Sequence, residues 1–229
     1  MNRFILLRQR CARRQSVALP SSRPRPGAAL ITVIALLLTA VVIATPVQGQ
    51  EAVSPEMDAA LKNLQSGRYN AAKDTLEELA EQGDPTAQYY FGYMHSQGVG
   101  VEKDLAKALE LYRSAANQND AMGLAQLGRM YRNGEGVIQD FQEALRFTRL
   151  AAEQGNAYAQ RDMGSVYANG LGVLRDNEKA HMWYNLAAAS GEADAALQRQ
   201  TLAETMSEAD ITRAHDRARA CVAASFQGC

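Results

Sequence analysis

The sequence contains almost no proline beyond its first quarter. The last of its six prolines is Pro85, and the 144 residues that follow are rich in alanine, leucine, glutamate and glutamine. A stretch of this length without proline indicates helix throughout. With 47% hydrophobic and 21% charged residues, the 229-residue chain has the composition of a globular domain, which excludes disordered, collagen-like and multi-spanning membrane proteins.

Acidic residues are also absent from the beginning of the chain, where the first is Glu51. Seven arginines and then an apolar run over residues 28–44 occupy this segment, which is typical of an export signal, and we place cleavage after Gly49. The alternative is an uncleaved anchor, because seventeen apolar residues are at the lower limit for crossing a bilayer. Both interpretations predict that the rest of the chain is periplasmic or secreted.

The charge balance changes once this segment is set aside. It holds seven of the 24 basic residues, so the remainder has 17 against all 25 acidic residues, a net charge of −8. No basic stripe remains, which argues against nucleic acid as a partner and limits membrane contact to the N-terminal segment.

Cysteine is scarce, with three residues in all. Cys11 lies in the export segment, which leaves Cys221 and Cys229 as an even pair in an oxidising compartment. We expect a disulfide between them, worth about 2–3 kcal/mol in the loop-entropy model. Two free thiols are the alternative.

Glycine, by contrast, recurs with a period of 36 residues. The chain is therefore predicted to be a repeat protein with three units in phase. The recurring triplets are Gly92, Gly128 and Gly164; Gly98, Gly134 and Gly170; Gly100, Gly136 and Gly172; and Asp104, Asp140 and Asp176.

Each unit is predicted to form two helices. In the first unit, one helix covers residues 85–97, the turn covers residues 98–101, and apolar residues from Leu105 onward form the stripe of a second helix. Gly98 stands where a helix ends in a left-handed residue. Glycine within a helix costs about 1 kcal/mol relative to alanine, so Gly92 and its equivalents indicate close approach of two helices.

Helix pairs that match the repeat pattern only in part flank the three units, as expected for the ends of a stack. The predicted organisation is an export signal or anchor (1–49), an N-terminal capping hairpin (50–83), three repeats (84–191) and a C-terminal capping hairpin (192–229). The predicted fold is an all-α, right-handed α/α superhelical solenoid of about five helical hairpins.

The residues that recur at equivalent positions of the three units resemble the Sel-1-like repeat, a family related to the tetratricopeptide repeat. The resemblance rests on Ala87-Gln88-Tyr89, Gly92, the run Gly98-Val99-Gly100-Val101, and Asp104, with their equivalents in three copies. It departs at His95, which replaces a tyrosine, and at Ala125 and Arg161, which take the place of Tyr89. The resemblance implies an adaptor or scaffold that holds another protein, and exported bacterial members act in the cell envelope.

No catalytic motif was found. The three histidines are scattered in the sequence, zinc-ligand spacings are missing, and no serine nucleophile has a base nearby. Gly98-Val99-Gly100 follows a helix and has no lysine, so we interpret it as a helix-ending turn instead of a phosphate loop. We therefore expect a non-enzyme with no cofactor and no metal. The alternative is an envelope enzyme similar to cysteine-rich, penicillin-binding repeat proteins, although these repeats contain no cysteine.

Binding of a protein is the better hypothesis, because curved stacks of helix pairs hold partners on the concave face lined by their first helices. Positions on these helices outside the buried columns differ between copies, and tyrosine and arginine often carry interface energy. The predicted partner-binding residues are Tyr90, Tyr93, Gln97, Gln126, Arg129, Asn133, Asp162 and Ser165, with Asn169 as a further equivalent.

His181 stands at the position of the repeat that Leu109 and Leu145 occupy in the other two copies. One interpretation is a polar patch that responds to pH, because histidine titrates near neutrality. The alternative, which we favour from the sequence, is a loosely packed seam in which His181 meets a local partner, since no second titrating group is nearby in the sequence.

Overall fold

The computed structural model describes residues 54–229, so the predicted export segment and its cleavage site lie outside the described residues. Within this range the chain is helical and contains no strand. The ten helices are α1 (Pro55–Gln65), α2 (Tyr69–Glu81), α3 (Pro85–Gln97), α4 (Leu105–Asn117), α5 (Ala121–Asn133), α6 (Phe141–Glu153), α7 (Ala157–Asn169), α8 (Asn177–Ala189), α9 (Ala193–Ala203) and α10 (Glu208–Ala223).

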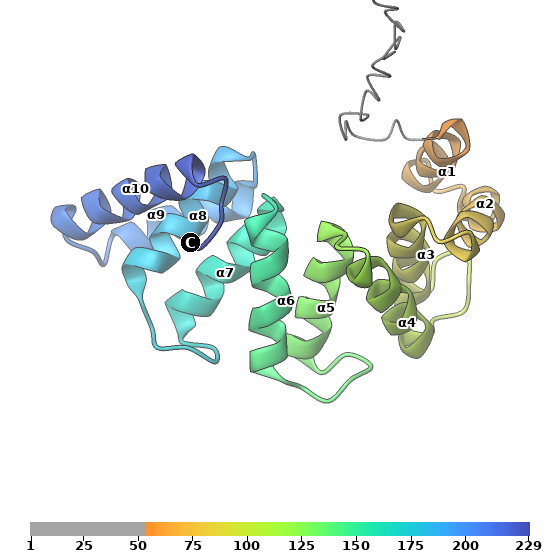
Figure 1. Ribbon diagram of the computed structural model, residues 1–229, viewed down its shortest axis with the longest axis horizontal. Helices are drawn as coiled ribbons and strands as arrows, with labels where there is room; N and C mark the ends of the chain where they lie inside the picture. The colour runs from red at the N-terminus through yellow and green to blue at the C-terminus, as the bar shows by residue number, and fades with distance from the viewer. Residues whose placement is uncertain (1–53) are drawn as a thin grey trace, which may run out of the picture. The chain divides into compact units, whose positions relative to one another are not determined.

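The helices follow one another in space as they do in sequence (Figure 1). From α1 to α9 each helix packs on the next, and α3 also touches α5, the first helix of the following repeat. Each unit therefore buries its apolar surface against its neighbours, as expected for a solenoid. None of the helices of residues 54–229 combines the length and the apolar character needed to span a bilayer.

Polar caps and glycines set the ends of the repeat helices. Asp104, Asp140 and Asp176 begin α4, α6 and α8, where each side chain accepts hydrogen bonds from backbone N–H groups of the first turn. Gly98 ends α3 with a φ of 72°, and its two equivalents end α5 and α7 in the same left-handed conformation. These predicted helix ends are confirmed.

The glycines within the first helices lie where two helices meet. A Cβ atom on Gly128 would be 3.1 Å from the backbone nitrogen of Thr148 and 3.2 Å from the carbonyl oxygen of Ala144, both in α6. A Cβ atom on Gly92 would be 2.9 Å from the ring of Tyr112 in α4. The predicted close approach is therefore confirmed, and the space gained is filled by a facing side chain or backbone.

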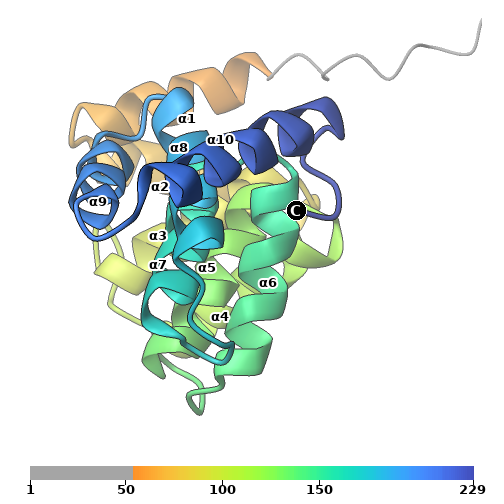
Figure 2. The same ribbon diagram turned by 90° about the vertical axis from the view of Figure 1, so that its left-hand side faces the viewer.

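The C-terminal pair differs from a simple hairpin, because α9 and α10 both pack on α8 (Figures 1 and 2). Ser207 begins α10 with a capping box that it forms with Asp210. Ala214, Ala218 and Cys221 form the buried stripe of α10. On the exposed side, Arg213 donates hydrogen bonds to Glu178 of α8 at 2.8 and 3.0 Å.

The predicted disulfide between Cys221 and Cys229 is present, with Cα atoms 5.5 Å apart. It folds the tail after α10 back on itself. Within this tail, Phe226 packs against the C-terminal core, and the Gln227 side chain donates to the carbonyl oxygen of Glu153 at 3.1 Å. The disulfide therefore fixes a tail that contacts the end of α6.

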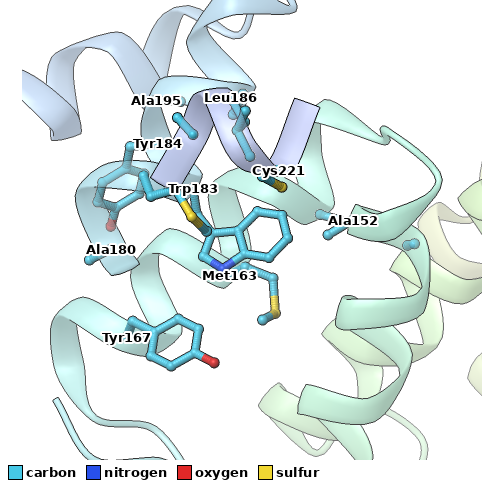
Figure 3. Packing of buried hydrophobic residues seen from close by; sticks show 14 of the residues in the cluster. Ala152, Met163, Tyr167, Ala180, Trp183, Tyr184, Leu186, Ala195 and Cys221 are labelled. Atoms are coloured by element: carbon cyan, nitrogen blue, oxygen red, sulfur yellow. The ribbon is translucent and has the colours of Figure 1, made fainter. Parts of the chain in front are cut away.

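The buried residues fall into three clusters along the stack. The N-terminal cluster includes Met57 and Leu76, the middle one includes Tyr112 and Leu127, and the C-terminal one is the largest. Trp183 is the single tryptophan of the chain and lies fully buried in the C-terminal cluster (Figure 3). This end of the solenoid therefore has the most extensive core.

Candidate functional site

The first helices of the repeats, α3, α5 and α7, present one face with an open cleft. The cleft has a volume of about 430 Å³, and its walls combine aromatic, aliphatic and amide side chains. Its lining residues are Tyr89, Met122, Ala125, Gln126, Asn156, Ala157 and Tyr158. We call this surface the first-helix face.

Tyrosines form one wall of the cleft. Tyr89 contacts Tyr90 edge to face, with ring centroids 4.8 Å apart, and lies 6.0 Å from the ring of Tyr112. Burial, followed by the neighbouring tyrosines, raises the pKa of Tyr89 to about 12. Its hydroxyl therefore stays protonated at neutral pH, and this wall offers a neutral aromatic surface to a ligand.

The other wall is Tyr158, whose side chain is 65% exposed. The guanidinium of Arg161 lies over its ring, 5.7 Å from the centroid. Arg161 in turn donates to Glu192 at 2.9 Å, which fixes the guanidinium in place. Tyr158 is thus an exposed aromatic side chain held by a cation–π contact, a combination suited to recognition.

A polar network extends from the cleft along α5 to the turn that follows it. Arg129 donates to Gln126 at 2.9 Å and forms an ion pair with Glu135 at 3.0 Å. Asn133 donates to the same carboxylate at 2.8 Å. These side chains hold one another in defined positions, so they offer a pre-organised polar surface.

A second network joins α5 to α7. Arg132 contacts Asp162 at 2.9 Å, and Arg161 contacts the same carboxylate at 3.2 Å. Ser165, one turn further along α7, accepts a hydrogen bond from Asn169 at 3.3 Å. The charge of Asp162 is therefore matched within the face by two arginines.

The predicted partner-binding residues have different environments. Tyr93 is 41% exposed and Gln97 is also exposed, whereas Tyr90 is half-buried and packs against the N-terminal cluster. Gln126, Arg129 and Asn133 belong to the first network, and Asp162 to the second. Whether these residues bind a partner stays a prediction.

Of the residues that line the cleft, sequence reasoning predicted only Gln126 as a binding residue. The residues it missed include Met122 and Tyr158. They occupy the same position of the 36-residue repeat, or column, as Thr86, at the start of each first helix. This column varies between repeats as strongly as the predicted ones do and lies one turn before them on the same side of the helix. The variation was therefore a signal that could have identified both residues.

The repeats match a known family model. Residues 85–120, 121–156 and 157–192 each match the Sel1 repeat. The chain is a Sel1 repeat protein. The predicted family and the all-α solenoid are thus confirmed, and Sel1 repeat proteins generally act as scaffolds for protein–protein interactions.

Solved structures of other Sel1 repeat proteins share the fold. A Sel1 repeat protein from Oxalobacter formigenes is 32% identical over 69% of this chain and 65% of its own, with a TM-score of 0.60. A protective antigen present in uropathogenic Escherichia coli strains, which displays an SLR fold, is 25% identical over 73% of this chain and 41% of its own, with a TM-score of 0.62. The chain thus spans about two-thirds and two-fifths of these proteins. No curated protein sequence matches it.

Within residues 54–229 of this Sel1 repeat protein, histidine, cysteine and carboxylate side chains form no group of three or more that could hold a metal ion. The first-helix face is built from aromatic rings, amides and paired charges.

Proposed function

We propose that this Sel1 repeat protein is an exported scaffold of the bacterial cell envelope that binds a protein partner on its first-helix face. The family's general role in protein interaction supports the scaffold role and the binding of a protein partner. The arginine-led N-terminal sequence supports export, because it has the order of charged, apolar and small residues of a signal.

The observation that carries the binding proposal is the aromatic cleft between Tyr89 and Tyr158. Its rings are held by neighbouring side chains, so binding costs little conformational entropy. The adjacent networks of Arg129 and Arg132 supply paired polar groups around this centre. Interfaces with this arrangement place aromatic anchors at the centre and polar groups at the rim.

The first experiment compares the affinity of two double variants for a partner. The partner is first identified by cross-linking the exported protein in cells. The Tyr93→Ala, Tyr158→Ala variant is expected to bind it more than tenfold more weakly, because a buried aromatic anchor is typically worth about 2 kcal/mol. We avoid Tyr90 because its ring also packs against the N-terminal core.

The matched control is Ile138→Ala, Leu174→Ala. These side chains are each 91% exposed at the turns after α5 and α7, away from the cleft. The control is expected to keep full affinity. Loss of binding in the control alone would assign the interface to the turns and contradict the proposal. Hydrolysis of a chromogenic β-lactam by the purified chain would contradict the scaffold role itself.

Export has its own test. Residues 1–60, fused to a reporter that is active only outside the cytoplasm, are expected to give activity. The matched fusion, in which all seven arginines before the apolar run are replaced by glutamate, is expected to lose most of it, because basic residues hold the N-terminus inside. An inactive wild-type fusion would overturn the assignment of an export signal.

A further inference from the structure

A second cleft lies at the other end of the molecule, between α8, α9 and α10. Its volume is about 530 Å³, and its lining is almost entirely polar and basic. The lining residues are His181, Asn185, Arg199, Ile211, His215 and Arg219. We call it the α8–α10 cleft. It is separate from the first-helix face, and the inference from it does not depend on the proposed function.

His181 forms the inner wall of the α8–α10 cleft. Its side chain is 2% exposed, and its Nδ1 atom is fully buried without a hydrogen-bond partner among the described residues. His215 of α10 lies beside it, with ring centroids 5.3 Å apart. A buried polar atom without a partner costs free energy that a bound ligand can recover.

The charges around His181 are nearly all positive. Arg199 of α9 donates to the Asn185 side chain at 2.6 Å and has no carboxylate partner in the described part of the chain. Arg219 of α10 forms an ion pair with Asp216, which does not line the cleft. The cleft thus presents several N–H donors with little negative charge to balance them.

Apart from Glu208 at the start of α10, the remaining charges on the packed helices are paired. On α8, Glu178 lies one turn before His181 and accepts from Arg213 at 2.8 Å, and Arg217 approaches it at 3.5 Å. Glu178 is therefore engaged by α10 on the far side of the cleft lining. Glu178 therefore does not balance the excess positive charge near His181 and Arg199.

We propose that the α8–α10 cleft is a binding site for a small oxyanion, with Arg199, His181, His215 and Arg219 as donors. Arginine is suited to this role because its planar guanidinium offers paired donors to a carboxylate, phosphate or sulfate. The anion would supply the negative charge that the three helices do not. It would also tie α9 and α10 together through α8.

The site is expected to couple anion binding to proton uptake. Burial, followed by His215 and Arg199, lowers the pKa of His181 to about 4 in the empty cleft. A bound anion opposes the positive neighbours and raises that pKa, so His181 takes up a proton when the anion binds. Affinity therefore rises as the pH falls from 7.5 to 5.5.

The experiment titrates the purified chain with sodium sulfate in a calorimeter, at constant ionic strength maintained with sodium chloride. Sulfate keeps both charges throughout this pH range, so a change in affinity reports on the protein. We expect saturable binding that is tighter at pH 5.5 than at pH 7.5. Arg199→Gln is expected to weaken it about tenfold, since a hydrogen bond to a charged group is worth roughly 1.5–3 kcal/mol.

Two further variants serve as controls. Arg175→Gln makes the same change of charge at an exposed arginine outside the cleft, and it is expected to bind sulfate as the wild type does. His181→Leu restores the residue type of the equivalent positions in the first two repeats. It is expected to fold and to lose the part of the pH dependence of binding that comes from His181, while His215 remains in the cleft.

A parallel titration with sodium acetate distinguishes the chemical type of the anion that the cleft prefers. Tighter binding of sulfate indicates a tetrahedral group such as phosphate, and tighter binding of acetate indicates a carboxylate. The absence of saturable binding by either anion would overturn the proposal. Equal weakening by Arg199→Gln and Arg175→Gln would overturn it too, because the effect would then come from net charge.

Discussion

The Trp183→Ala variant is expected to lose about 3–5 kcal/mol of unfolding free energy, the usual cost of truncating a fully buried tryptophan. Trp183 lies in the C-terminal cluster, which combines residues of α7, α8 and α10 such as Met163, Leu186 and Cys221 (Figure 3). No single helix can close the resulting cavity, because the cluster is built from residues of several helices. Denaturant unfolding followed by circular dichroism measures the loss.

The Trp183→Phe variant is a matched control with a different expectation. The indole Nε1–H of Trp183 is buried and has no hydrogen-bond partner within the described residues. Phenylalanine removes this unpaired donor, which offsets part of the packing lost with the smaller ring. We expect a loss below about 1.5 kcal/mol. A loss as large as that of Trp183→Ala would show that the N–H is satisfied in solution.

Breaking the Cys221–Cys229 disulfide is expected to lower the unfolding free energy by about 2–3 kcal/mol, because the cross-link restricts the unfolded chain. The double variant Cys221→Ala, Cys229→Ser removes it while keeping the buried position apolar. In the exported wild type, intact mass is expected to increase by two hydrogens on reduction. Two free thiols in freshly isolated protein would contradict the bond.

Reductant provides the control for this effect. It should destabilise the wild type and leave the double variant unchanged, since only the wild type has a bond to lose. The tail also contacts Gly155 through Phe226 and Glu153 through Gln227. Hydrogen exchange should therefore increase in the tail and at the end of α6 when the bond is broken. An increase confined to the tail would show that these contacts form without the bond.

The sequence was sufficient to predict the repeats because their determinants are local. The aspartate caps, the left-handed glycines and the apolar stripes each act within one or two turns of helix, and three copies in phase reinforced each of them. The role of Gly128 depends on its contact with α6, and yet the sequence predicted it. Glycine destabilises a helix, so its recurrence within the first helices indicated close packing against another helix.

The features that the sequence did not predict depend on contacts between residues that are distant in the sequence. His181 was identified from its column, but the neighbouring His215 lies 34 residues further on and belongs to a helix whose packing on α8 no periodicity predicts. Tyr90 has the sequence signature of a variable surface position, and yet it packs against residues from the flanking hairpin. Here non-local packing determined the environment of the side chain.

The packing of α10 also has a consequence for self-association. A repeat stack with an open apolar end can add a second molecule head to tail, and repetition of that contact produces a filament. In this chain α10 covers the C-terminal core around Trp183 and presents exposed polar residues such as Thr212 and Asp216. A second molecule would have to displace α10 from α8 before it could continue the stack, so α10 opposes chain-to-chain growth from this end.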